Sequence, residues 1–402
     1  MSQTEKKFIA NNAVGSAQAR LENNSSLRAR NAANSADIDL IKANASDLGE
    51  LGVKTQSPFP PTAPNDLVNK SYADGVGTSP GTKNVIINSN LDIWQDGPTF
   101  NNPTSQSYAA DMFRINYDGT IGTFAVTREA FTLGQTDVPY NPSYYLRWNQ
   151  TAAGSGSTVR SLQIPVARVR TFAGGDSSFS IYLKADAART VGIRTVQNFG
   201  TGGSPSADVV SSTQSVNVTT GFTQFQVSLP MASISGKTLG TNNDDYIYVE
   251  LLLPVNVTMT IDVAQLMWNY GTTFASWQYY TGGVNYDQSA ELSACEQFYC
   301  KSYETDTIPG TATTDGSQAE TESSGSILPG QNFPSTMFKD PVVTLYAAFT
   351  GTINNVSRNS NSTDAPVQSV ISSKKGFTYI LLSANNDPGN TFVYHWVSNG
   401  RP

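Results

Sequence analysis

The sequence predicts a mainly β fold. It comprises an extended or helical N-terminal segment, a jelly-roll-like β-sandwich, a short connecting helix and a small C-terminal β tip domain. From residue 84 onward, short apolar runs follow one another with Gly, Asn and Pro turn signals between them. Charged residues make up only 14% of the chain, against roughly 25% in an average soluble protein. A helical apolar stripe occurs only near residue 290.

Residues 1–83 are expected to be an N-terminal segment and linker without a core of their own. Apolar side chains are sparse there, so the segment would become ordered by docking on something else. Weak three-to-four spacing predicts a short helix around Asp37–Ala45, and Asp66 is a candidate N-cap for a second helix within Asn65–Gly75. Four prolines between them favour extended backbone: Pro58, Pro60, Pro61 and Pro64.

Residues 84–284 are expected to form a two-sheet sandwich or jelly roll. It would open with a short apolar strand over Val85–Ile87. Further strands are predicted at Phe124–Arg128, Tyr145–Trp148, Ser161–Val169, Phe179–Leu183, Val191–Val196, Gln214–Val218, Phe222–Leu229, Tyr246–Leu253 and Val257–Met267. Asp244 and Asp245 are interpreted as part of a turn, with an oxygen-ligand Ca²⁺ site as the minor alternative.

Residues 285–306 are expected to connect the sandwich to the last domain. A helix is predicted over Asn285–Lys301, with Asp287 as its N-cap. Its apolar stripe consists of Leu292, Cys295, Phe298 and Tyr299. Cys295 and Cys300 would point in different directions on that helix, so no disulfide is expected. Free thiols suit assembly in a reducing cytoplasm.

Residues 307–402 are expected to form the small C-terminal β tip domain. Its predicted strands are Val342–Phe349, Gly351–Val356, Gln368–Ile371, Phe377–Ser383 and Thr391–Val397. A domain of this size buries only a modest core by itself, so oligomerisation would help to stabilise it.

Composition argues against several classes of function. The net charge of −7 gives no basic face for nucleic acid. No run of about 18 apolar residues occurs, so no membrane insertion is expected. The single histidine, His395, and the absence of a GxSxG motif leave little for a Ser–His–Asp system. We therefore expect no cofactor, no metal and no enzymatic activity, although glycoside hydrolysis requires only two carboxylates.

Six blocks of sequence resemble, in the same order, segments of one protein family. They are NVIINSNLDIWQDGPTF…YAADMF (84–113), SFSIYLKA (178–185), VTTGFTQFQVSL (218–229), TIDVAQLMWNYGTTFASWQYY (260–280), LSACEQFYCKSY (292–303) and FPSTMFKDPVVTLY (333–346). The family is the bacteriophage tail fibre and receptor-binding (appendage) proteins with a carbohydrate-binding-module-like β-sandwich. NDLVNKSYADG (65–75) is similar to a segment of phage tail and collar proteins. Met112-Phe113 and Lys339-Asp340 depart from the family's usual Arg-Trp and Arg-Ala.

The resemblance implies a homotrimeric structural protein of a phage virion, assembled in the host cytoplasm. Residues 1–75 would attach the fibre to tail, neck or capsid proteins, and the outer domains would recognise host surface polysaccharide for adsorption. The alternative is a head fibre or capsid decoration protein with no essential receptor role.

Sugar binding requires flat apolar rings together with hydrogen-bonding partners. Trp94 and Trp268 lie in the family's strand motifs and are expected in the core. The candidate ligand-binding residues are Tyr394, His395, Trp396 and Arg401, at the expected distal end of the fibre. For these four, surface recognition and packing within a trimer are both open, and a strand histidine between aromatic residues is more often structural.

Overall fold

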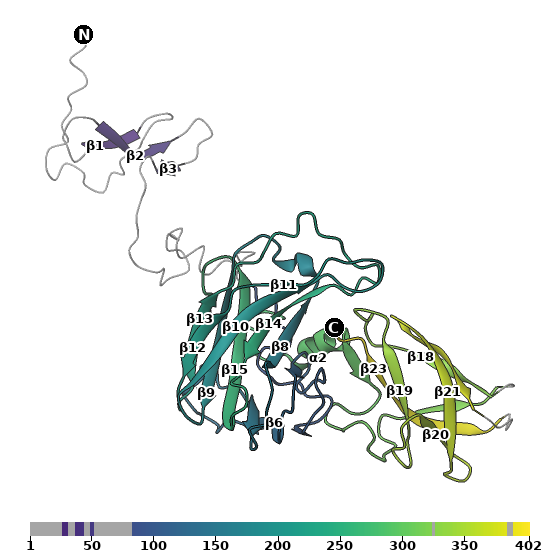
Figure 1. The fold of residues 1–402 in the computed structure, drawn as a ribbon. Helices are drawn as coiled ribbons and strands as arrows, with labels where there is room; N and C mark the ends of the chain where they lie inside the picture. Colours follow the sequence, from purple (N-terminus) through teal and green to yellow (C-terminus); the bar gives the residue numbers. More distant parts are fainter. Residues whose placement is uncertain (1–25, 31–36, 44–48, 52–82, 324–325, 384–388) are drawn as a thin grey trace. The chain divides into compact units, whose positions relative to one another are not determined.

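A computed structural model describes residues 26–30, 37–43, 49–51, 83–323, 326–383 and 389–402. The chain divides into two compact units, Met1–Thr78 and Ser79–Pro402 (Figure 1). Every strand pairing among the described residues is antiparallel, and the predicted mainly β fold is confirmed. None of the helices in these ranges has the length and hydrophobicity to span a membrane.

The N-terminal unit contains a three-stranded sheet in the order β1-β2-β3. Its strands are β1 (Ser26–Arg30), β2 (Asp37–Ala43) and β3 (Gly49–Leu51). The helix predicted around Asp37–Ala45 is therefore wrong. Polar and apolar residues alternate in Asp37–Leu40, and this period of two is the period of a strand. The predicted helix within Asn65–Gly75 and the proline-rich linker lie outside the described residues.

The second unit begins with a sandwich of two six-stranded sheets. The first sheet has the order β11-β10-β14-β8-β5, with β12 also pairing with β10. Its strands are β5 (Arg114–Tyr117), β8 (Arg160–Ala167), β10 (Arg189–Asn198), β11 (Val209–Val210), β12 (Gln214–Val218) and β14 (Tyr246–Leu252). A short 3-10 turn, η2 (Val169–Thr171), follows β8.

The second sheet has the order β13-β9-β15-β7-β6-β4. Its strands are β4 (Thr99–Asn101), β6 (Phe124–Ala130), β7 (Tyr144–Gln150), β9 (Ser177–Ala185), β13 (Thr223–Ser228) and β15 (Met259–Tyr270). Alternate residues of both sheets point inward and form one large hydrophobic core. Trp94 and Trp268, predicted to be core residues, are 3% and 0% exposed and belong to it.

The opening segment of the sandwich is not the strand predicted over Val85–Ile87, because it has no regular pairing. It lies instead against a bulge in β15, where the register shifts. The Val85 N–H donates to the Trp268 carbonyl at 3.0 Å, and the side chain of Asn84 bonds the backbone of both Leu266 and Trp268. Hydrogen bonds between the Asn84 side chain and the bulged part of β15 thus take the place of regular backbone pairing in the opening segment.

The helix predicted over Asn285–Lys301 is shorter than expected. Helix α2 spans Gln288–Glu296, and the predicted N-cap Asp287 is confirmed, since its carboxylate accepts from the Ala290 N–H. The chain then turns into β16 (Tyr299–Lys301), which pairs with the last strand. In this segment, pairing of Tyr299–Lys301 with β23 outweighs the helical propensity of the sequence. Both cysteines are free and buried.

The C-terminal sheet has eight strands around the last one, β23 (Thr391–Asn399), which pairs with β16, β17, β19 and β20. Its other strands are β17 (Gln318–Thr321), β18 (Ile327–Asn332), β19 (Val342–Ala347), β20 (Asn355–Arg358), β21 (Asp364–Ser373) and β22 (Gly376–Leu382). The strand predicted over Gly351–Val356 is misplaced, because Gly351 is in a turn with φ 73°. The domain limits 1–83, 84–284, 285–306 and 307–402 stay predictions.

Candidate functional site

A row of four polar side chains crosses the outer face of the first sheet. It runs from Arg114 on β5 through Gln163 on β8 and Glu250 on β14 to Arg194 on β10, and each is paired in register with the next. Their sequence neighbours, such as Ile115 and Leu251, point inward to the core. Because side chains alternate along a strand, the four residues share the outer face. We call this set the polar row.

Hydrogen bonds join the polar row into one network. Arg114 Nε donates to Gln163 Oε1 at 2.8 Å, and Gln163 Nε2 donates to Glu250 Oε1 at 2.8 Å. Ser161 Oγ and Arg194 Nε donate to Glu250 at 2.7 and 2.8 Å. Burial alone would raise the pKa of Glu250, but these donors outweigh it and hold that pKa below its usual value. Glu250 is therefore ionised at neutral pH.

Two tyrosines of β14 lie beside the polar row. The rings of Tyr246 and Tyr248 are stacked with centroids 5.8 Å apart and an interplanar angle of 27°. The Arg114 guanidinium lies 5.5 Å from the centroid of each ring, and it donates to the Tyr246 hydroxyl at 3.3 Å. Both rings are half-buried. This tyrosine pair therefore offers partly accessible ring surface beside a cation.

A cavity of about 750 Å³ borders this face. Its lining comes from the turn before β14 and from the C-terminal sheet: Thr241, Asn242, Asn243, Asp244, Lys339, Asp340, Val342, Lys374, Asn399 and Arg401. Pro402, which follows the lining residue Arg401, contacts the polar row: its carbonyl accepts from Arg114 at 3.0 Å and from the Tyr108 hydroxyl at 2.7 Å. A second cavity of about 480 Å³ shares Asn399 and Arg401 with the first.

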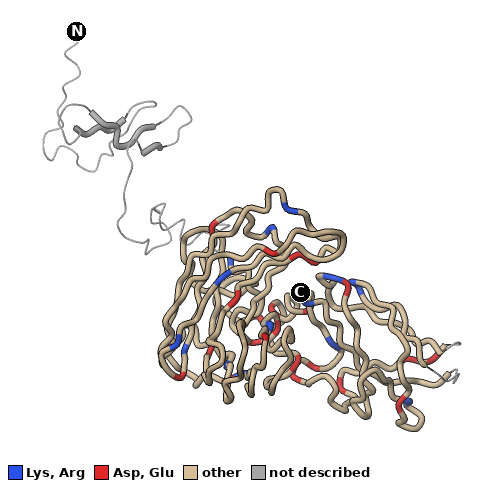
Figure 2. Tube along the Cα trace, viewed as in Figure 1, with Lys and Arg blue, Asp and Glu red and all other residues tan. Residues whose placement is uncertain are grey.

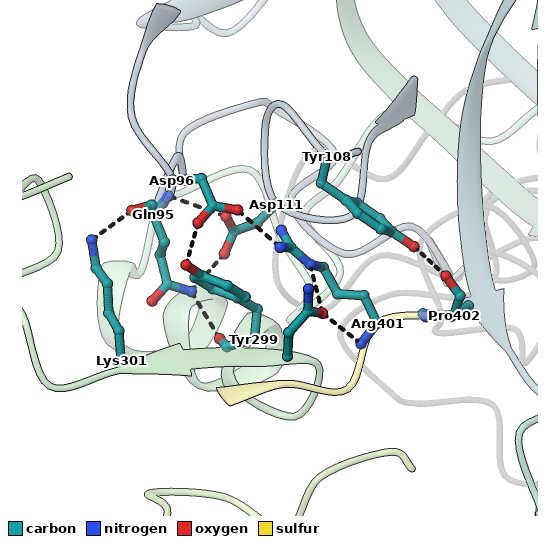
Figure 3. A network of polar contacts seen from close by, with 9 residues as sticks. Gln95, Asp96, Tyr108, Asp111, Tyr299, Lys301, Arg401 and Pro402 are labelled. Carbon is teal, nitrogen blue, oxygen red and sulfur yellow. Dashed lines mark hydrogen bonds and ion pairs between the residues drawn. The ribbon is translucent and has the colours of Figure 1, made fainter. Parts of the chain in front are cut away.

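A separate polar cluster, which we call the clasp, ties the opening segment of the sandwich to β16 and Arg401 (Figure 3). Arg401 pairs with Asp96 at 2.9 Å, and the Tyr299 hydroxyl donates to the same carboxylate. Gln95 donates to Asp111 at 2.6 Å. Lys301 Nζ donates to the carbonyls of Gln95, Thr305 and Thr307.

The clasp contains strongly perturbed acids and bases. Burial raises the pKa of Asp111 to about 6 and lowers the pKa of Lys301 to about 8. Such shifts often mark catalytic groups. Here, however, all three N–H groups of Lys301 are used by carbonyls, and Asp111 is only 1% exposed. Lys301 and Asp111 therefore hold chain segments together and are not placed to take part in a reaction.

The four candidate residues from the sequence do not form a surface site. Tyr394 and His395 are 0% exposed, Trp396 is 5% and Arg401 is 7%. Tyr394 and Trp396 belong to the core of the C-terminal sheet. β23 is covered on both faces: Tyr394 and Trp396 pack in the core of the C-terminal sheet, whereas His395 packs against Tyr303 and contacts the Thr313 carbonyl. Of the four, Arg401 alone lines the cavities described above.

His395 is held as a structural residue. Its Nε2 contacts the Thr313 carbonyl at 2.9 Å and must carry the proton, so Nδ1 accepts from Ser302 Oγ at 3.1 Å. The ring stacks on Tyr303 at 3.7 Å, and burial lowers the pKa of His395. This is a Ser–His pair, yet neither cavity described above reaches Ser302.

The described residues contain no group of three or more His, Cys, Asp or Glu side chains placed to hold a metal ion. Asp244 and Asp245, the minor alternative for a Ca²⁺ site, both have protein partners. Asp244 accepts from the N–H and hydroxyl of Thr201 at 2.7 and 2.6 Å, and Asp245 pairs with Arg168 at 3.2 Å. These bonds agree with the turn interpretation.

Sequence reasoning missed the polar row and the tyrosine pair. The signal was present in Tyr246–Glu250, where Tyr, Tyr and Glu alternate with Ile and Val. Alternation of this kind marks a strand with one apolar face and one face bearing large polar groups. Which strands lie beside β14, and hence which arginines meet Glu250, follows only from the sheet order.

No protein-family model and no curated protein sequence matches the chain. Among solved structures, similar ones include a CBM4 module, with 16% identity over 46% of this chain and 99% of that chain (TM-score 0.29). The CBM22-2 xylan-binding domain of Paenibacillus barcinonensis Xyn10C has 8% identity over 40% and 92% (0.26). The enzymatically active domain of bacteriophage CBA120 tailspike protein 4 has 11% identity over 46% and 21% (0.28). With TM-scores below 0.5, what these proteins bind is not transferred to this chain.

Proposed function

We propose that this chain binds glycans through the outer face of the first sheet, at the tyrosine pair and the polar row. The observation that carries the proposal is their adjacency: two parallel rings lie beside charged and amide groups that are already fixed in place. Sugars present flat C–H faces and a rim of hydroxyls, so they bind best to rings flanked by fixed donors and acceptors. Prior fixation lowers the entropy cost of binding.

We further propose that the protein is a homotrimeric structural fibre of a bacteriophage virion that recognises host surface polysaccharide. The six sequence blocks support this role, and several copies of a weak site would bind a repeating polysaccharide far more tightly than one. We also propose that the chain is not an enzyme. Both oxygens of Glu250 accept hydrogen bonds and its pKa is low, so this residue is unsuited to act as the general acid of a glycosidase.

The binding proposal is tested with Tyr248→Ala on an immobilised panel of bacterial polysaccharides. Stacking on one aromatic ring contributes about 0.5–1.5 kcal/mol, so we expect a roughly two- to ten-fold loss of affinity. The matched control is Tyr182→Ala, because Tyr182 is a half-buried tyrosine on the outer face of the second sheet. If Tyr248→Ala binds glycans as tightly as wild type, the proposal that glycans bind at this face of the first sheet is wrong.

The fibre role is tested separately. Purified protein should compete with virions for adsorption to host cells, and light scattering should give the mass of three chains. A stable monomer would contradict the trimer, and undiminished adsorption would contradict receptor recognition. A tag at Pro402, imaged on intact particles, would place the protein on the tail or on the capsid.

A further inference from the structure

The cavity beside the polar row contains two lysines that the glycan proposal does not use. We propose that this cavity binds the carboxylate of an acidic sugar residue adjacent to the one held by the tyrosine pair, through Lys339 and Lys374. This inference rests on the proposed glycan binding and names its ligand class: an acidic polysaccharide. The cavity of about 750 Å³ lies within the range of about 300–1,000 Å³ usual for small-ligand sites.

The charge of both lysines remains available to a ligand. Both side chains are half-buried, and within the described part of the chain no ion pair of 4.0 Å or less involves either one. Lys374 Nζ donates one N–H to the Phe338 carbonyl at 3.3 Å, so two N–H donors remain. Figure 2 shows Lys and Arg positions beside the C-terminus, in a chain that is mostly uncharged.

The other charges of the cavity wall are already compensated or exposed to water. Arg401 is paired with Asp96 in the clasp, so it is not counted. Both oxygens of Asp244 accept from Thr201, and Asp340 is exposed to solvent, where its charge is screened. Lys339 feels the charge of Asp244, but neither lysine has an ion-pair partner within 4.0 Å among the described residues.

The cavity and the polar row are electrostatically connected. Burial lowers the pKa of Lys339, Asp244 opposes this shift, and the positive charge of Arg114 adds to it. In the structure, Arg401 lines the cavity and the carbonyl of the next residue, Pro402, accepts from Arg114, so the C-terminal residues connect the cavity with the polar row. A carboxylate placed between Lys339 and Arg114 would reduce the repulsion between these cations. It would also compensate for the hydration that Lys339 loses through burial.

The test compares acidic oligosaccharides with neutral counterparts of the same backbone. Oligogalacturonate, hyaluronan oligosaccharides and oligosialic acid are immobilised beside their carboxyl-reduced forms, and the full chain is applied at 50 and 300 mM salt. We expect at least one acidic glycan to bind ten-fold or more tightly than its reduced form. The double variant K339Q/K374Q should lose that preference and its salt dependence. Lys375→Gln is the control, because this exposed neighbour does not line the cavity.

The outcomes separate this inference from the proposed function. Neutral and acidic forms that bind equally, with binding lost in Tyr248→Ala, would overturn the acidic-sugar site and leave the glycan face intact. An acidic preference unchanged in K339Q/K374Q would also overturn it. No binding to any member of the panel would count against both proposals. Unfolding midpoints of all variants, measured by circular dichroism, ensure that only folded protein is compared.

Discussion

The polar row and the clasp are built from the same side chains, yet they differ in what surrounds them. Each contains an arginine, a carboxylate and an amide; a tyrosine belongs to the clasp, and two tyrosines lie beside the row. The row is assembled by register on neighbouring strands of one sheet. The clasp joins residues far apart in the sequence, such as Asp96 and Arg401, and encloses them at a junction. Arg114, Gln163 and Glu250 of the row are themselves buried, so the accessible surface of this face comes from the half-buried Arg194, Tyr246 and Tyr248. In the clasp, Asp111 and Tyr299 are buried, whereas Asp96 and Arg401 line a cavity.

The two carboxylates respond to these surroundings in opposite ways. Glu250 receives several donors, so its pKa lies below the usual value despite burial. Asp111 receives bonds from Gln95 alone, and burial dominates, so its pKa is raised to about 6. Asp111 and Glu250 are both almost fully buried, at 1% and 2% exposure, so the number of donors and not the exposure separates their pKa values. In this chain a shifted pKa marks a structural junction, whereas a fully bonded, ionised carboxylate marks the proposed ligand face.

The largest effect is expected from breaking the clasp. Arg401→Ala removes the cation that pairs with Asp96 and acts on Asp111, and loss of one partner from a buried pair costs about 3–5 kcal/mol. Urea unfolding at pH 7 measures the change. Arg189→Ala is the control: Arg189 forms an ion pair with Asp186 near the surface, and such pairs contribute less than about 1 kcal/mol. Equal losses in both variants would show that the clasp adds no stability.

A second prediction uses the raised pKa of Asp111. Its pKa is about 6 in the folded chain against a usual 3.8, so the folded state holds the proton more tightly than the unfolded state. The stability it contributes is present below pH 3.8 and is lost as the pH rises through 6. At about 1.4 kcal/mol per pKa unit, wild type should lose about 2 kcal/mol relative to Asp111→Asn between pH 4.5 and 7.5.

The free energies of unfolding of both proteins, measured at several pH values, test this prediction. The comparison uses the difference between them, so groups that titrate equally in both cancel. A difference that stays constant across this range, or that rises with pH, would mean that Asp111 is not held protonated by burial.

Most of the sandwich could be predicted from sequence, and the candidate site could not. In runs such as Gln214–Val218, the local residue pattern alone predicts a strand, and β12 has the same bounds. Val85–Ile87 failed because Asn84 and the bulge of β15 supply its hydrogen bonds, a contact across the chain that no local pattern encodes. The polar row depends on sheet order in the same way. Surface recognition and packing were both open for Tyr394 and Trp396, and the structure packs both side chains into the core of the C-terminal sheet.

The smallest effect, and the one that completes the comparison, is expected from Glu250→Gln. The folded-state pKa of Glu250 is lowered, so its stabilisation is present above the usual value of 4.5 and is lost as the pH falls through the folded pKa. A hydrogen bond to a charged group contributes about 1.5 kcal/mol, and the variant should lose about this much at pH 7.

As the pH falls below 4.5, the gap between wild type and Glu250→Gln should close, opposite in sign to the trend for Asp111→Asn. Thermal unfolding of both variants at pH 3, 5 and 7 measures the two trends side by side. Two gaps that change in the same direction would contradict the difference in surroundings inferred for the two carboxylates. Glycan affinity at pH 7 should also fall in Glu250→Gln, because Arg194 and Gln163 lose the ionised acceptor that fixes them, and it should stay unchanged in Asp111→Asn.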